Sequence, residues 1–266
     1  MRTSRIGRQW PARMVQYLAT SGRQTRSSVP AWLIPFNSSK SKQMPSSTMT
    51  NHNMPELPLR HEALSPRTPS AQPPLLVLLH GYGSNEEDLL QLAPYLPEVC
   101  QIVSLRAQLM LAPGSNCWYE LAFTQTGIVA DTKQAIQSLA ILRETYHTAI
   151  AQYASDPNRV AVVGFSQGAG MAGMLALCEP TIRCSVLLSG LNPFAMLPTS
   201  EITVPNPNVL VVHGSYDEVV PIATGHSCRD AFVAHGATVQ YAEYPIGHTI
   251  DLRVIAALTS YLAAHL

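Results

Sequence analysis

One serine of this sequence has the neighbours that a catalytic nucleophile requires. Ser166 stands between Gly164 and Gly168 in the pattern G-x-S-x-G, directly after the apolar run 160–163. The pattern is typical of a nucleophile elbow, a sharp turn between a strand and a helix that exposes the serine hydroxyl. Glycine two residues away on each side lets the chain pass without a Cβ clash. The backbone N–H of Gln167, at the start of the next helix, is a candidate donor to the negative charge that develops in acyl transfer.

A serine hydroxyl needs a base to remove its proton and an acid to orient that base. Asp217 fits the acid best, because it follows the apolar run 209–212 by a short turn, and functional groups collect beyond the ends of parallel strands. Glu218 is adjacent and is the alternative acid. His248 is the predicted base, since it lies in a loop after the last predicted strand. The resulting order of serine, acid and histidine is that of an α/β-hydrolase.

A second main-chain donor is expected in the loop after an early strand. His80-Gly81-Tyr82-Gly83 follows the apolar run 75–79, and we predict the N–H of Tyr82 as this oxyanion donor. His80 itself is predicted to hold the loop by hydrogen bonds rather than to catalyse.

The elements that must position these residues alternate along the chain. Continuous apolar runs predict strands buried on both faces, and the segments between them have helical spacing. We therefore predict one α/β domain over residues 71–266, with the α/β-hydrolase fold, a mostly parallel sheet, helices on both faces and no separate lid domain. Strands are expected at 75–79, 102–105, 159–163, 184–188, 209–212 and 237–241, and helices at 84–93 (capped by Ser84 or Asn85), 130–153, 171–178, 222–235 and 252–264.

Composition narrows the class of protein. The chain has 266 residues, of which 46% are hydrophobic, enough for a full single-domain core. Residues 56–266 carry all seventeen acidic residues against nine basic ones, which argues against nucleic acid as a partner. The five cysteines are odd in number and lack C-x-x-C spacing, so we expect free thiols, a reducing compartment and no zinc site. No apolar run reaches the ~18–20 residues of a membrane span, and the expected location is the cytoplasm.

The first 70 residues are predicted to be a disordered, basic extension rich in Ser, Arg and Pro. Residues 1–55 carry eight Lys/Arg and no Asp or Glu. Two interpretations stay open. This composition suits an organellar transit peptide, which would place the protein in an organelle. Alternatively, the extension is not part of the native protein, whose start would then be Met44, Met49 or Met54.

Taken together, these motifs resemble a known family, the phospholipase/carboxylesterase group of serine α/β-hydrolases, which includes acyl-protein thioesterases. The resemblance covers about residues 74–264, and it departs from the usual Arg-Ala-Pro of bacterial members at Gln108. The matching motifs are His80-Gly81-Tyr82-Gly83, Gly164-Phe165-Ser166-Gln167-Gly168, His213-Gly214-Ser215-Tyr216-Asp217 with Val219-Val220-Pro221, and Gly247-His248-Thr249-Ile250.

The resemblance implies hydrolysis of carboxylic esters, with lysophospholipids and acyl thioesters as further candidate substrates and without metal or organic cofactor. In the sequence itself, the apolar segment 190–207 contains Leu191 and Phe194. With Trp118 and Tyr119 it is expected to line a groove for an acyl chain; the alternative is that it only covers the sheet edge. The sequence leaves the oligomeric state open, a homodimer included.

Two other functions compete with hydrolysis. The stretch 168–173 is literally G-x-G-x-x-G, but a dinucleotide fold needs the first glycine immediately after the strand and an acid about 20 positions further on, and neither is present. These glycines are expected instead to let the helix pack close to the sheet. The third possibility is a non-catalytic binder on the same fold, because fold does not fix function. The presence of a serine, an acid and a histidine in the required order counts against it.

Overall fold

The computed structural model describes residues 56–124 and 127–266, and in this part of the chain a seven-stranded sheet forms the centre. The strand order is β1-β3-β2-β8-β9-β10-β11, and every pairing is parallel except that of β1 with β3. The predicted mostly parallel α/β sheet is therefore confirmed. Its strands are β1 (His61–Leu64), β2 (Pro74–Leu79), β3 (Gln101–Leu105), β8 (Asp156–Phe165), β9 (Ile182–Leu188), β10 (Asn208–Gly214) and β11 (Thr238–Tyr244).

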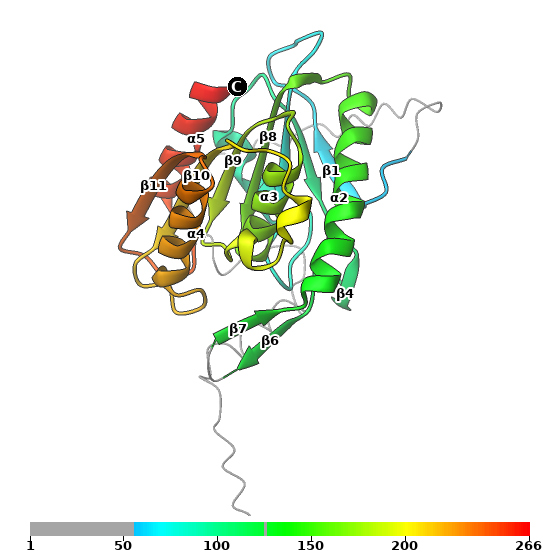
Figure 1. Cartoon of the computed structure of the whole chain (residues 1–266). Helices are drawn as coiled ribbons and strands as arrows, with labels where there is room; N and C mark the ends of the chain where they lie inside the picture. The colour runs from blue at the N-terminus through cyan, green and yellow to red at the C-terminus, as the bar shows by residue number, and fades with distance from the viewer. Residues whose placement is uncertain (1–55, 125–126) are drawn as a thin grey trace, which may run out of the picture.

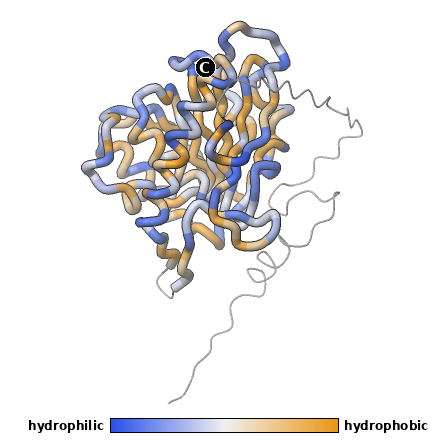
Figure 2. The backbone as a smooth tube through the Cα atoms, turned by 90° about the vertical axis from the view of Figure 1, so that its right-hand side faces the viewer, coloured by the Kyte–Doolittle hydropathy of each residue, from blue (hydrophilic) through white to orange (hydrophobic). Residues whose placement is uncertain are grey.

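Helices cover both faces of the sheet, as Figure 1 shows. Alternate residues of each strand belong to different hydrophobic clusters, because successive side chains point to opposite faces. One cluster joins the sheet to α2 (Thr132–Gln152), α3 (Gln167–Cys178) and α4 (Ile222–Ala234). The other joins it to the 3-10 helix η1 (Leu89–Tyr95) and to α5 (Leu252–His265). Figure 2 shows the hydrophobic segments gathered in the interior of the domain.

The strand β1 corrects the predicted domain boundary. His61–Leu64 lie within the stretch 1–70 that was expected to be disordered, yet they pair with β3 along its outer edge. Leu57 and Leu59, just before the strand, are buried in the core. The sequence signal was weak because an edge strand of four residues has no continuous apolar run. The remainder of the expected extension, residues 1–55, lies outside the described residues.

The helix predicted at 84–93 is also different in the structure. Ser84 forms an isolated antiparallel bridge with Asn116, residues 86–88 form a turn, and the only helical part of this segment is the 3-10 helix η1, which contains Pro94. Asn85 does accept a hydrogen bond from the N–H of Glu87, at 2.9 Å, but this closes a turn before η1. Glu86, which belongs to the predicted helix, is fully buried and binds arginine. The predicted capped helix is therefore wrong, because its first half is a bridge and a turn.

Two hairpins between β3 and α2 were not predicted. β4 (Leu109–Ala112) pairs with β5 (Ser115–Cys117), and β6 (Leu121–Thr124) pairs with β7 (Gly127–Ala130). Each strand has only three or four residues. In Figure 1 the β6–β7 hairpin projects from one end of the domain.

The parallel arrangement decides where the site lies. β2, β8, β10 and β11 run in the same direction, so their carboxyl ends meet at one edge of the sheet. The segments that follow them carry the loop 80–83, Ser166, Asp217 and His248 in turn. Residues 190–207, which follow β9, contain two 3-10 turns, η2 (Pro193–Ala195) and η3 (Thr199–Glu201), and form no further layer.

Candidate active site

Ser166 has the backbone conformation of a nucleophile elbow. Its φ is 55° and its ψ is −116°, a combination that costs a non-glycine residue about 1–3 kcal/mol. The surrounding glycines make this turn possible. A Cβ on Gly164 would lie 2.1 Å from the carbonyl oxygen of Gly168, and one on Gly168 would lie 2.1 Å from that of Leu79. The elbow therefore tolerates no side chain at either position.

His248 and Asp217 are hydrogen-bonded, although 31 residues separate them in the chain. The imidazole Nδ1 lies 2.7 Å from Oδ2 of Asp217, and the other carboxylate oxygen accepts the N–H groups of Val219 (2.9 Å) and Val220 (2.8 Å). A proton on Nδ1 that is donated to the carboxylate leaves Nε2 free to accept another proton. The alternative acid, Glu218, is exposed.

The same imidazole lies beside the elbow. Its ring packs against the ring of Phe165, the residue before Ser166, with centroids 4.8 Å apart. The loops that bear the acid and the histidine are tied together, because the N–H of Tyr216 donates to the carbonyl of Ile246 at 3.0 Å. The fold thus brings all three predicted residues to one edge of the sheet.

Two opposing effects act on the pKa of Asp217. Burial raises it, while the hydrogen bonds from His248 and from two backbone N–H groups lower it, and the net result is a lowered pKa. A second histidine supports the acid loop: His213 Nε2 lies 2.8 Å from the carbonyl of Val220 and 3.7 Å from Oδ2 of Asp217. Burial lowers the pKa of His213, so this ring is a neutral donor at pH 7.

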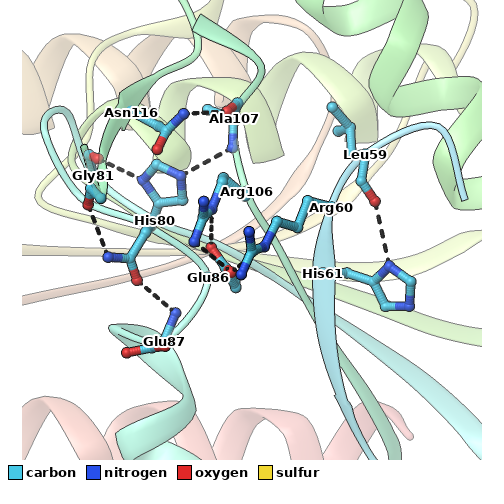
Figure 3. Close-up of polar contacts among 12 residues, drawn as sticks. Leu59, Arg60, His61, His80, Gly81, Glu86, Glu87, Arg106, Ala107 and Asn116 are labelled. Carbon is cyan, nitrogen blue, oxygen red and sulfur yellow. Dashed lines mark hydrogen bonds and ion pairs between the residues drawn. The ribbon is translucent and has the colours of Figure 1, made fainter. Parts of the chain in front are cut away.

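The loop after β2 is held by His80, shown in Figure 3. Nδ1 of His80 lies 2.7 Å from the carbonyl of Gly81, and Nε2 lies 3.0 Å from the N–H of Ala107, so the ring donates at one nitrogen and accepts at the other. Burial lowers the pKa of His80 to about 4, which keeps the ring neutral. These are the hydrogen bonds expected of a loop-fixing residue. The loop also touches the elbow, since a Cβ on Gly81 would lie 3.4 Å from that of Ser166.

An ion cluster that sequence reasoning missed lies behind this loop (Figure 3). The carboxylate of Glu86 is fully buried and binds Arg106 through both oxygens, with Nη2 to Oε1 at 2.7 Å. Arg60, from the segment before β1, adds a contact of 3.1 Å. Burial raises the pKa of Glu86, but Arg106 and Arg60 outweigh it and the net shift is downward. Nothing in the local pattern distinguishes Glu86 from its acidic neighbours, so only the fold identifies it.

The predicted substrate residues have different environments. Leu191 and Phe194 are half-buried, and the ring of Phe194 packs edge-on against Phe232 of α4, with centroids 5.0 Å apart. Trp118 and Tyr119 have no exposed surface at all. Contrary to expectation, neither Trp118 nor Tyr119 therefore lines an open groove. Trp118 instead donates its indole N–H to the carbonyl of His80 and its main-chain N–H to the side chain of Gln167, both at 2.9 Å.

The G-x-G-x-x-G stretch serves packing. Gly168 is in close contact with the end of β2, as expected of a helix that lies near the sheet. Gly170 and Gly173 differ from that expectation, because they pack against segment 190–207: a Cβ would lie 2.9 Å from Met196 Cε and 2.7 Å from Pro193 Cγ, respectively. Among the described residues, no three His, Cys, Asp or Glu side chains gather as metal ligands, and no helix is long and apolar enough to cross a membrane. The five cysteines are free and buried.

The fold and the arrangement at its edge define an α/β-hydrolase, and comparison with known proteins gives the family. The phospholipase/carboxylesterase family model matches residues 61–266, so the chain belongs to that family. This match begins at β1, in agreement with the corrected boundary.

Solved structures have the same fold. Esterase PE8 is 28% identical, with a TM-score of 0.70, over 78% of this chain and 99% of its own. The carboxylesterases of Bacillus cereus and Mesorhizobium loti are each 22% identical, with a TM-score of 0.67 over 78% of this chain. The match covers 95% of the Bacillus chain and 96% of the Mesorhizobium chain.

Proposed function

We propose that this protein is a serine hydrolase that cleaves carboxylic esters through Ser166, His248 and Asp217. The observation that carries the proposal is the 2.7 Å hydrogen bond between His248 and Asp217, with the same imidazole packed against the elbow that holds Ser166. Membership of a family of phospholipases and carboxylesterases supports the same reaction class.

The reaction follows from the roles of the three residues. His248 Nε2 takes the proton of the Ser166 hydroxyl as the oxygen attacks the ester carbonyl, and Asp217 stabilises the imidazolium through Nδ1. The carbonyl oxygen becomes an oxyanion, which accepts hydrogen bonds from the main-chain N–H groups of Tyr82 and Gln167. The imidazolium then protonates the departing alcohol as the C–O bond breaks, leaving an acyl-enzyme on Ser166. Water, deprotonated by His248, releases the carboxylic acid and restores the serine.

The acyl part of the substrate is proposed to lie against segment 190–207. Leu191 and Phe194 are half-buried there and offer the apolar surface that an acyl chain needs. Lysophospholipids and acyl thioesters present the same acyl carbonyl and are candidate substrates beside simple esters. No cofactor is required for any of these reactions in the proposed mechanism.

A fluorophosphonate probe tests the proposal directly, because it reacts only with an activated serine. We expect the wild-type protein to be labelled and Ser166→Ala to be unlabelled but still folded, as judged by circular dichroism. Hydrolysis of p-nitrophenyl esters of increasing chain length, lysophosphatidylcholine and an acyl thioester then ranks the substrate classes. A folded wild-type protein that is neither labelled nor active would favour the non-catalytic binder. Thermal stabilisation by NAD in that case would favour the dinucleotide alternative.

A further inference from the structure

The two proposed oxyanion donors belong to different loops, so other contacts must hold the two N–H groups in fixed positions relative to each other. The N–H of Tyr82 follows β2, whereas the N–H of Gln167 begins α3 after β8. Oxyanion donors act at 2.7–3.1 Å from the developing charge, and small displacements weaken them.

Trp118 is hydrogen-bonded to both loops. Its main-chain N–H donates to Oε1 of Gln167, and its indole N–H donates to the carbonyl of His80, each at 2.9 Å. The amide of Gln167 completes a second bond on the same side, from Nε2 to the carbonyl of Tyr119 at 2.6 Å. Trp118, His80 and Gln167 are all buried, with exposed fractions of 0%, 0% and 1%. Water therefore cannot replace these bonds.

These hydrogen bonds also orient the N–H of Tyr82, through the His80–Gly81 and Gly81–Tyr82 peptides. Trp118 holds the carbonyl of His80, and the imidazole of His80 holds the carbonyl of Gly81 at 2.7 Å. In a planar trans peptide the N–H points opposite to the C=O. Fixing the carbonyl of Gly81 therefore also fixes the direction of the N–H of Tyr82.

We propose that Trp118 is a positioning residue, which couples the two halves of the oxyanion hole by donating one hydrogen bond to each. The role rests on the proposed function. It differs from the acyl-groove role expected from the sequence, because Trp118 acts through hydrogen bonds to His80 and Gln167 and not through contact with substrate.

Trp118→Phe tests this role, since it keeps an aromatic ring and the main-chain N–H but removes the indole N–H. We expect kcat to fall about 10-fold or more, less than the roughly 10²–10³-fold loss that follows removal of a donor itself. KM should change less than about threefold. Affinity for an alkyl trifluoromethyl ketone, whose adduct with the serine is an oxyanion, should fall by the same factor as kcat/KM, because both report transition-state binding.

Ser138→Ala is the matched control. The buried hydroxyl of Ser138 donates to the carbonyl of Trp118, a different group from the two N–H groups of Trp118 that reach His80 and Gln167. Its loss should lower thermal stability while kcat stays within about twofold of wild type. An equal loss of kcat in Ser138→Ala and Trp118→Phe would overturn the proposal, because general loosening of packing would then explain both.

A second variant tests the same coupling at Gln167. It replaces Trp118→Phe as the test of the proposal if that variant does not fold. Gln167→Met keeps the backbone N–H but removes both side-chain hydrogen bonds, and we expect the same selective loss of kcat. The double variant should lose less than the product of the single losses, because both act through one connection.

Three results separate failure of this inference from failure of the proposed function. An unchanged kcat in Trp118→Phe, or in Gln167→Met where that variant stands in, overturns the coupling. A rise in KM with unchanged affinity for the trifluoromethyl ketone also overturns it, and assigns Trp118 to substrate binding. Wild-type protein that is not labelled by fluorophosphonate refutes the proposed function, and the coupling falls with it.

Discussion

At the scale of single residues, Asp217 has two tasks at once. One carboxylate oxygen accepts hydrogen bonds from the N–H groups of Val219 and Val220, and the other accepts a hydrogen bond from His248. The first task shapes the loop, and the second orients the imidazole. Because both oxygens of this buried acid are hydrogen-bonded, a substitution at Asp217 affects the loop and the imidazole together.

Asp217→Asn should abolish most activity without unfolding the protein. If the amide oxygen stays with the two backbone N–H groups, the NH₂ group faces Nδ1 of His248 and forces the proton onto Nε2. That tautomer cannot accept the proton of Ser166, and kcat/KM for a p-nitrophenyl ester should fall roughly 10³–10⁴-fold.

Glu218→Gln is the control for this change, since the adjacent side chain is exposed and was the alternative acid. Its kcat/KM should stay within about twofold of wild type. A larger loss in Glu218→Gln than in Asp217→Asn would mean that the acid of the proposed triad has been misassigned.

At the scale of elements, the short strand β1 links the outer edge of the sheet to the site. Arg106 donates its main-chain N–H to the carbonyl of Arg60 at 2.8 Å, and both arginines bind Glu86 behind the loop of His80. Arg106 also precedes Ala107, whose N–H holds the imidazole of His80. An edge strand of four residues thus supports the loop that carries a proposed oxyanion donor.

Removal of β1 should cost much of the stability of the domain. A chain that begins at residue 71 lacks Leu57 and Leu59, which are only 5% and 3% exposed, and leaves β3 as an open edge. Relative to a chain that begins at residue 56, we expect a loss of about 3–6 kcal/mol in the free energy of unfolding, at ~1.5–3 kcal/mol for each buried leucine. Urea titration of the two chains measures the difference, and the shorter one should also aggregate more readily. Equal stability would show that β1 is dispensable.

At the scale of the whole molecule, two hydrophobic clusters lie on the two faces of the sheet, and the edge at the carboxyl ends of its parallel strands contains buried polar groups. His80 is one of them, and its imidazole is fully buried and neutral. Global unfolding exposes this ring to water, where its pKa returns to 6.5 from about 4. Between these two values the unfolded state binds more protons than the folded state, so stability must fall as the pH falls from 6.5 towards 4.

This linkage predicts a pH-dependent difference between the wild-type protein and His80→Gln. The contribution of His80 to the free energy of unfolding should decrease by about 2 kcal/mol between pH 7 and pH 5. The variant lacks this contribution, so its stability should decline less over the same interval, as measured by urea titration at both values. The buried His213 has the same sign of shift and remains in both proteins, so it does not affect the comparison. Parallel declines would show that folding does not lower the pKa of His80.

The sequence by itself determined the features that depend on local pattern. The elbow needs glycine at 164 and 168, apolar runs specify buried strands, and parallel strands place the loops after them at one edge. These facts predicted the fold class and drew attention to Ser166, Asp217 and His248 before any contact was known.

Only the tertiary structure decided what depends on partners distant in the chain. From the sequence, Trp118 was predicted to line an apolar groove. In the structure its indole N–H donates to His80 and its main-chain N–H donates to Gln167, 38 and 49 residues away in the chain. Glu86 turns inward to meet Arg106, and β1 exists because β3 offers it an edge. Local sequence carries propensity and periodicity, whereas a buried polar group is placed by whichever group the fold brings within reach to satisfy it.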